Sequence, residues 1–322
     1  MRLRIWGGLL LVAAALATNG GALAQTYPDR PVRILIAFPA GGTIDTLGRI
    51  LAQKLTEAWG QNVVIENRPG GGGNIGAAAA AKSTPDGYTL HFGAQTLGVN
   101  VTLQPSKDFD PLKDFDPIML VATAQDVLLV PPNSPFRSVP DLIAYAKAHP
   151  GTLNFGFGQG TAPQLVGEWF NKTNGLQIAS VPYKGGMQAI TDMLGGTIQL
   201  NIGTSSTLLP LIREGKIRAI AQWGKSRETD LPEVPTMIES GFPGLSLGFW
   251  VGLWAPAGTP RSIVDELNRA TNAALSSPQM KDSMARLGIA PSLGSVQDFE
   301  AFIADEAPRW AEIVKTSGTQ ID

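Results

Sequence analysis

The chain has 322 residues, with 25 lysines and arginines against 27 aspartates and glutamates, two histidines and no cysteine. A net charge of −2 lacks the basic excess of nucleic-acid-binding proteins, so we expect no nucleic-acid partner. The lack of cysteine excludes disulfides, and the length is sufficient for two lobes of ordinary domain size.

The first 24 residues have the pattern of a secretory signal peptide. Arg2 and Arg4 precede an apolar stretch at 5–17, and Ala22-Leu23-Ala24 forms a small-x-small cleavage site. The apolar stretch is too short to span a bilayer, which needs about 20 apolar residues. We therefore expect a cleaved signal at 1–24 and a mature periplasmic chain with 23 basic against 27 acidic residues.

Strand and helix patterns alternate along the mature chain, which predicts an α/β fold with parallel strands covered on both faces. Strands are predicted at 32–38, 62–66 and 89–92, with helices at 46–59 and 76–82, followed by a polar, proline-rich surface excursion at 104–117. A second set has strands at 118–120, 127–130, 154–157, 178–181, 199–202 and 219–221, and helices at 139–148, 163–173, 187–194 and 208–214. An extended run at 247–255 and helices at 260–275, 278–287 and 296–315 close the chain. We expect residues 26–124 and 249–322 to form lobe 1, and residues 125–248 to form lobe 2.

Two glycine-rich loops each follow a predicted strand and open a predicted helix. They are FPAGGTID at 38–45 and GFGQGTAP at 156–163. Free N–H groups at a helix start can bind an anion, and glycine allows a ligand to approach the backbone. Either loop alone also fits a plain connection, but one from each lobe could hold opposite ends of an anion. Asp45 could hold its loop or contact the ligand, and Gly42 and Gly160 are expected to be required by backbone angles or ligand contact.

Two further loops carry polar side chains after predicted strands. In SVPYKGG at 180–186, Tyr183 offers an aromatic wall with a hydroxyl and Lys184 offers charge, although a loop lysine is usually a solvated surface group. The hydroxyl-rich run at 203–207, GTSST, could bind substrate oxygens or cap a helix.

Patterns for catalysis, metals and cofactors are weak. Gly71, Gly73 and Gly76 spell G-x-G-x-x-G, but the next strand ends without the acid that a dinucleotide site requires. His91 lies in an apolar strand and His149 in a polar turn, so they form neither a zinc site nor a catalytic pair. No G-x-S-x-G motif occurs. We therefore expect no catalytic residue, no metal and no cofactor.

Several segments, taken in order, resemble one family over essentially the whole mature chain. They are YPDRPVRILIAFPAGGTIDTLGR at 27–49, VVIENRPGGGGNIGA at 63–77, STPDGYTL at 83–90, DPLKDFDPI at 110–118, VPYKGGMQAITDMLGGTIQ at 181–199, EGKIRAIA at 214–221, LPEVPTMIESGFPG at 231–244 and APAGTP at 255–260. The chain resembles the substrate-binding proteins of tripartite tricarboxylate transporters, the Bug family.

The resemblance implies a non-catalytic, two-lobed periplasmic-binding-protein fold of the Venus-flytrap, type II-like class, with two strand crossovers. It implies di- or tricarboxylates, acidic amino acids or aromatic acids as ligands, and a membrane permease as partner. The ligand positions that it carries over are Phe38, Ala40, Gly41, Gly42, Thr43, Asp45, Gln159, Gly160, Thr161, Ala162, Tyr183, Lys184, Gly185, Gly186, Thr204 and Ser205.

The loop after the third strand departs from the family pattern. Many relatives have a small-Thr-His pattern before an asparagine, whereas this chain has AQTLGVN at 94–100. We include Gln95 and Thr96 among the expected ligand contacts. The neutral, partly apolar loop permits a less highly charged acid.

Two other functions fit parts of the sequence. One is an exported serine hydrolase with Ser205 as a loop nucleophile, which turnover of esters or amides would reveal. The other is a periplasmic ligand-sensing subunit of a signalling system, which a neighbouring kinase gene rather than a permease gene would indicate. We expect a monomer in each case.

Overall fold

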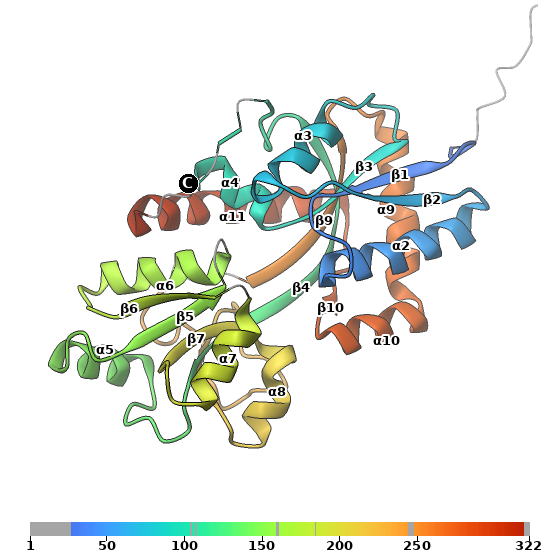
Figure 1. The fold of residues 1–322 in the computed structure, drawn as a ribbon. Helices are drawn as coiled ribbons and strands as arrows, with labels where there is room; N and C mark the ends of the chain where they lie inside the picture. The colour runs from blue at the N-terminus through green and yellow to red at the C-terminus, as the bar shows by residue number, and fades with distance from the viewer. Residues whose placement is uncertain are drawn as a thin grey trace, which may run out of the picture.

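The computed structural model describes residues 27–103, 105–106, 108–158, 161–183, 185–243 and 248–318. The signal peptide predicted at 1–24 lies outside these residues. The described chain forms two α/β lobes, and β4 and β9 pass from one lobe to the other (Figure 1).

Pairing of the strands places a parallel set in each lobe. β1 pairs in parallel with β2 and β3, and β5 pairs in parallel with β6 and β7. The order is β2-β1-β3-β9-β4-β7-β5-β6, with β8 and β10 paired to β4 off this path. The strands are β1 (Val32–Ile36), β2 (Val63–Asn67), β3 (Thr89–Ala94), β4 (Phe115–Val130), β5 (Asn154–Gly158), β6 (Ala179–Tyr183), β7 (Leu200–Thr204), β8 (Arg218–Gln222), β9 (Gly248–Pro256) and β10 (Ala290–Pro291).

The strand β4 joins the two lobes because it changes partner along its length. It pairs antiparallel with β9 as far as Gln125, and with β7 from Asp126 onward. The sequence predicted two short strands at 118–120 and 127–130, which was wrong: one strand of 16 residues spans both. The polar residues Thr123, Gln125 and Asp126 obscure its continuity in the sequence, and the pairing with β9 and β7 keeps them extended.

The predicted surface excursion at 104–117 is only partly correct. Phe109 and Phe115 are both buried and their rings meet edge to face, with centroids 6.1 Å apart. Strand β4 already begins at Phe115. The proline-rich spacing of this segment obscured two aromatic anchors that attach it to the core.

Helices flank both sets of strands (Figure 1). They are α2 (Thr43–Trp59), α3 (Asn74–Ala81), α4 (Thr96–Leu103), α5 (Val139–Ala148), α6 (Ala162–Thr173), α7 (Gly186–Leu194), α8 (Ser205–Arg213), α9 (Arg261–Ser276), α10 (Pro278–Leu287) and α11 (Val296–Ser317), with a 3₁₀ turn at Gly71–Gly73. The segment predicted as a loop at 94–100 instead enters α4. Within the described ranges, none of these helices has the length and apolar character needed to cross a bilayer.

A packing requirement explains the last glycine of the G-x-G-x-x-G run. A Cβ at Gly76 would lie 2.7 Å from the Arg68 carbonyl oxygen and 2.8 Å from the Ala37 Cα. Because backbone atoms cannot move aside cheaply, only glycine lets α3 approach the end of β1 so closely. The glycine serves helix–strand packing at this point.

Candidate binding site

A cavity of about 500 Å³ lies between the two lobes, within the size range of small-molecule sites. Its wall is formed by the carboxyl ends of strands, the starts of helices and the middle of β4. The lining residues are Phe38, Thr43, Ile44, Ala94, Gln95, Thr96, Asp126, Gly158, Thr161, Ala162, Pro163, Gly186, Met187, Ile190, Asn201, Ile202, Gly203, Thr204, Thr207, Leu208 and Phe249.

Helix N-termini from both lobes meet at this cavity. Thr43, Thr96, Ala162 and Gly186 line it and are the first residues of α2, α4, α6 and α7. Thr204, which precedes α8, lines it as well. Free N–H groups of a first helical turn and the positive end of the helix dipole both favour an anion. The arrangement therefore concentrates anion-binding groups around one space.

These first turns also lack side-chain caps. Among the described residues, the N-cap side chains before α2, α6, α7 and α8 accept no hydrogen bond from the helix, and two of these N-caps, Gly42 and Gly185, are glycines. By contrast α5, α10 and α11 begin with serines whose hydroxyls accept a first-turn N–H. Helices α3 and α9, which begin elsewhere, are also without such a cap. No N-cap side chain therefore occupies the first-turn N–H groups of these four helices, although in α6 and α7 the Gln164 and Gln188 N–H groups bond to the Thr161 and Gly185 carbonyls.

The side chains in the wall are mostly neutral. Gln95 accepts the Trp250 backbone N–H through Oε1 at 3.3 Å, and its Nε2 donor has no acceptor among the described residues. The ionisable side chain in the described wall is an acid, Asp126. Its Oδ1 accepts a hydrogen bond from Thr204 Oγ1 at 3.0 Å. Burial, with a smaller contribution from the nearby Glu228 carboxyl, raises the pKa of Asp126 to about 6, although the Thr204 hydrogen bond opposes the shift.

Eight of the residues predicted from the sequence line the cavity. They are Phe38, Thr43, Gln95, Thr96, Thr161, Ala162, Gly186 and Thr204. Seven others lie off its wall: Ala40, Gly41, Gly42, Asp45, Tyr183, Gly185 and Ser205. Gln159, Gly160 and Lys184 lie outside the described residues.

Asp45 holds its loop rather than facing the cavity. It is 2% exposed, and its carboxylate accepts hydrogen bonds from Gly41 N at 2.8 Å, Arg49 Nε at 2.9 Å and Asn67 Nδ2 at 2.8 Å. Burial opposes ionisation, but these donors outweigh it and lower the pKa of Asp45. Of the two roles considered for Asp45, the contacts support the structural one.

The backbone requirement for glycine falls at Gly41 and not at Gly42. Gly41 has φ of +87°, a region that side-chain-bearing residues avoid. Gly42 is extended, with φ of −78°, and a Cβ there would approach no atom closer than 3.8 Å. The sequence-based expectation that backbone angles require glycine at 42 is therefore wrong by one residue, because a pair of glycines does not reveal which one turns left-handed.

The hydroxyls of Tyr183 and Ser205 are occupied by acids away from the cavity wall. Tyr183 Oη donates to Asp192 Oδ2 at 2.7 Å on α7. Ser205 is 1% exposed and donates from Oγ to Glu228 Oε1 at 2.9 Å. A serine nucleophile needs a base that accepts its proton. The two histidines are distant in the fold, since His91 is buried in β3 and His149 is exposed at the end of α5.

Residues that sequence reasoning missed fall into two kinds. Asp126 and Asn201 belong to strands β4 and β7, and no glycine-rich loop marks them. Met187, Leu208 and Phe249 supply apolar wall from α7, α8 and β9. The signal for Asp126 was an acid placed directly before the apolar strand run at 127–130, which the prediction of two short strands obscured.

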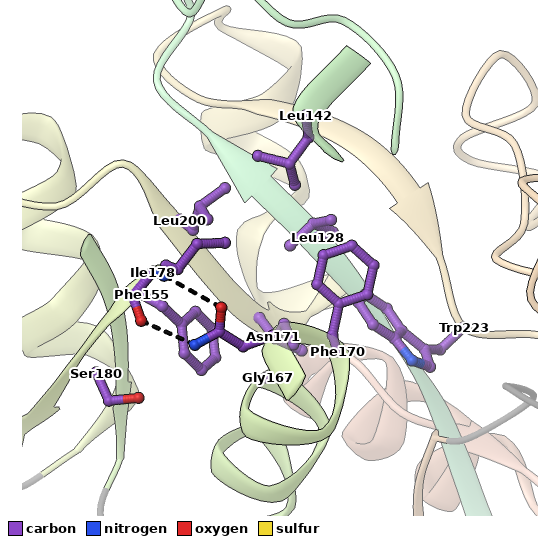
Figure 2. Close-up of a pocket in the computed structure, with 11 residues that line it drawn as sticks. Leu128, Leu142, Phe155, Gly167, Phe170, Asn171, Ile178, Ser180, Leu200 and Trp223 are labelled. Atoms are coloured by element: carbon purple, nitrogen blue, oxygen red, sulfur yellow. Dashed lines mark hydrogen bonds between the residues drawn. The ribbon is translucent and has the colours of Figure 1, made fainter. Parts of the chain in front are cut away.

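A second, smaller space lies inside the core of the lobe that carries β5–β7. Figure 2 shows it beside α6, which carries Asn171, and among Leu128, Phe155 and Trp223. Its volume is about 20 Å³, too small for a ligand larger than a water molecule. Asn171 closes one side, donating to the Ile178 carbonyl at 2.9 Å and accepting the Ile178 N–H at 3.1 Å (Figure 2). We regard it as a packing gap.

Comparison with known proteins identifies the family. The sequence model described as "Tripartite tricarboxylate transporter family receptor" matches residues 47–319. The chain belongs to this receptor family. Protein BugT of Bordetella pertussis is 38% identical over 319 residues, which cover 97% of this chain and 98% of that protein.

Solved receptors of related sequence share the fold. An R. palustris protein solved with adipate is 36% identical with a TM-score of 0.73, over 91% of this chain and 98% of that one. MatC from Rhodopseudomonas palustris, with bound malate, is 30% identical with a TM-score of 0.72, over 89% and 100%. A TctC solute-binding protein from Polaromonas reaches a TM-score of 0.81 at 26% identity, over 90% and 99%.

These similarities establish the class of protein. The chain has the two-lobed Venus-flytrap fold of periplasmic binding proteins, with β4 and β9 as its strand crossovers. Receptors of this family are solute-binding proteins, which are not enzymes. The alternative of a serine hydrolase acting through Ser205 is therefore incorrect, in agreement with the burial of Ser205, which is 1% exposed.

Proposed function

We propose that this receptor captures a small carboxylate in the cavity between its lobes and delivers it to the permease of a tripartite tricarboxylate-type transporter. The observation that carries the proposal is the meeting of uncapped helix N-termini at a cavity whose described wall has no basic side chain. Such a wall binds an anion through backbone N–H groups and helix dipoles. The adipate and malate bound to the two relatives support the same ligand class.

The site residues that we propose come from the cavity wall and from the loops that the family resemblance indicated. From the cavity wall come Phe38, Thr43, Gln95, Thr96, Thr161, Ala162, Gly186 and Thr204. The loop segments 40–45 and 183–186, with Gln159, Gly160 and Ser205, support these contacts or add to them. Ligand specificity would then depend on the apolar wall and on ordered water within about 500 Å³.

We propose that capture involves closure of two lobes. Lobe 1 comprises residues 26–124 and 249–322, and lobe 2 comprises residues 125–248. The change of partner in β4 between Gln125 and Asp126 lies at this division. Hinges of this kind are a few residues at the ends of elements that absorb the change in backbone angles. A ligand contacting both lobes would stabilise the closed form by its greater affinity for that form.

We further propose that the protein works as a monomer in the periplasm after removal of residues 1–24. The support is the basic start, the apolar stretch and the Ala22-Leu23-Ala24 site. The mature chain should begin at Gln25 or Thr26. Intact mass of the protein released from the periplasm measures this directly, and a chain that retains Met1 would contradict it.

A melting scan against a carboxylate panel tests the ligand class. The panel should include malate, adipate, succinate and benzoate, with glucose as a neutral control. At a concentration about 100-fold above its dissociation constant, a ligand raises the free energy of unfolding by about 2.7 kcal/mol. We expect at least one acid to raise Tm without being chemically altered. A shift with glucose and none with any acid would overturn the proposal.

A further inference from the structure

The cavity contains a feature that anion capture alone does not explain: an acid in its wall. Asp126 lines the cavity, yet it lies on the strand where β4 changes partner, among groups that would receive a carboxylate ligand. An ionised Asp126 would repel a second negative charge brought close to it. Where Asp126 is ionised, the ligand must therefore present something other than a carboxylate at this point.

The hydrogen bonds of Asp126 leave acceptor capacity on its carboxyl. Oδ1 accepts Thr204 Oγ1 at 3.0 Å, and within the described residues Oδ2 has no hydrogen-bond donor. Asp126 also borders another small space, of about 10 Å³, which is distinct from the gap in Figure 2. Trp223 lines this space, and its indole N–H has no acceptor among the described residues. Even if that N–H were bridged to Asp126, a carboxylate with about four acceptor positions would still require a donor on the cavity side.

Within the described part of the chain, the surroundings of Asp126 supply no positive charge. Glu228 is the ionisable group that acts on it among the described residues, and it is negative. Lys225, three residues before Glu228, is paired with Asp305 Oδ2 on α11 at 3.0 Å. A partly buried carboxylate without a neighbouring cation favours the binding of a cationic donor.

A second acceptor in the wall adds to the negative potential. Asn201 is 1% exposed, and its Nδ2 donates to the Gly156 carbonyl at 2.8 Å. Its Oδ1 is buried beside Gly203 and has no donor in the described structure. Because that oxygen is inaccessible, it contributes through its dipole rather than through direct contact. The side of the cavity formed by β4 and β7 is thus rich in acceptors.

We infer that the ligand is a zwitterionic acid, with its carboxylate at the helix N-termini and an ammonium group hydrogen-bonded to Asp126. The inference rests on the proposed function, since it assumes that the cavity binds a carboxylate. It makes Asp126 the residue that selects amino acids over nitrogen-free acids of the same length. Burial raises the pKa of Asp126 to about 6, so the charge that attracts the ammonium forms between pH 5 and 7.

Matched ligand pairs test the inference by calorimetry on the mature protein. The pairs are succinate with L-aspartate, glutarate with L-glutamate, and 3-phenylpropionate with L-phenylalanine, each at pH 5 and pH 7. In at least one pair the amino acid should bind at least tenfold more tightly, and its affinity should rise from pH 5 to pH 7. Asp126→Asn should abolish that preference and that rise. Asp265→Asn, which removes the same negative charge from an exposed acid on α9, should retain both the preference for the amino acid and the rise with pH.

Failure of the inference can be distinguished from failure of the proposed carboxylate binding. If nitrogen-free acids bind as tightly as their amino partners, or Asp126→Asn weakens both members of a pair equally, the inference fails while carboxylate binding stands. If the affinity of a nitrogen-free acid falls from pH 5 to pH 7 and Asp126→Asn retains its binding, a protonated Asp126 donates to the ligand and the inference is overturned. If none of the six acids binds while malate, adipate or benzoate raises Tm, the inference fails and carboxylate binding stands. If none of the six acids binds and no acid of that panel raises Tm, both proposals fail.

Discussion

Glu306 on α11 accepts the indole N–H of Trp250 on the crossover strand β9, with Oε2 and Nε1 3.3 Å apart. The same oxygen accepts the indole N–H of Trp310 at 3.1 Å. Trp310 packs in the core cluster of Phe155 and Leu165, whereas Trp250 packs with Trp254 and Phe299. One buried carboxylate therefore joins the C-terminal helix to the apolar cores on both sides of the crossover.

Removal of this carboxylate should destabilise the protein. Glu306→Ala leaves two buried indole N–H groups without an acceptor, and each such group costs about 1–3 kcal/mol. We expect the free energy of unfolding, measured in urea by tryptophan fluorescence, to fall by about 2–4 kcal/mol. Burial raises the pKa of Glu306, so the neutral Glu306→Gln should lose less than about 1 kcal/mol because its amide oxygen still accepts. Equal losses in both variants would contradict this role.

Gly186 provides a test of where the ligand lies. A Cβ at Gly186 would meet no protein atom within 4 Å, and the residue lines the cavity at the start of α7. Gly186→Val should therefore fold normally and weaken binding of the best acid of the panel by more than tenfold, because its methyl groups occupy ligand space. Gly195→Val is the matched control, since Gly195 follows the other end of α7, has a negative φ of −78°, has no Cβ contact shorter than 3.6 Å and lies off the cavity wall. Titration calorimetry on both variants decides, and similar affinities would place the ligand elsewhere.

Gly41 and Gly42 should respond in opposite ways to alanine. At Gly41 the positive φ costs a side-chain-bearing residue about 1–2 kcal/mol, and the Gly41 N–H must keep its bond to Asp45. Gly41→Ala should lower the free energy of unfolding by that amount. Gly42→Ala should change it by less than about 0.5 kcal/mol, because its backbone is already extended. Chemical denaturation of the two variants side by side measures the difference, and the reverse order would refute the assignment.

Arg49 distinguishes anion binding by backbone amides from binding by a guanidinium group. Its side chain is 52% exposed and lies off the cavity wall, with Nε on Asp45 at 2.9 Å and a terminal nitrogen on Asn67 Oδ1 at 2.9 Å. Arg49→Ala should weaken acid binding less than tenfold, through slight loosening of the 38–45 loop. A loss above a hundredfold, with the fold intact by circular dichroism, would mean that the guanidinium binds the ligand directly.

The glycine-rich loops were the part of the site that the sequence could predict, since FPAGGTID and GFGQGTAP mark strand ends that open helices. The family resemblance then placed Thr43, Thr161 and Ala162 of these loops among the ligand contacts, and all three line the cavity. It could not lead to Asp126, because its place in the wall depends on β4 changing partner from β9 to β7. Such pairings join residues far apart in the chain and leave no periodic signal in a single sequence.

His91 makes the stability of the protein sensitive to acid. It is 1% exposed in β3, with its ring 5.4 Å from that of Phe115 and 5.7 Å from that of Trp254, centroid to centroid. Burial lowers the pKa of His91 to about 4, below the value of 6.5 for an exposed imidazole. The folded state thus binds fewer protons than the unfolded state, and stability falls as pH decreases from 6.5 towards 4. The full loss is about 3 kcal/mol.

His91→Phe should remove the loss of stability that His91 causes at low pH, because the phenylalanine ring does not titrate and keeps the aromatic contacts. Urea unfolding at pH 7 and pH 4.5 measures the change in free energy for wild type and variant, and the wild type should lose about 2–3 kcal/mol more than the variant. Buried acids such as Asp126 have the opposite effect, because a raised pKa makes the fold more stable as pH falls. This effect is the same in wild type and variant, so it cancels in the difference between their two changes in free energy. The exposed His149 gives the matched control, because His149→Phe makes the same replacement outside the core. Identical pH dependence in His91→Phe and wild type would mean that the buried imidazole accepts its proton without cost.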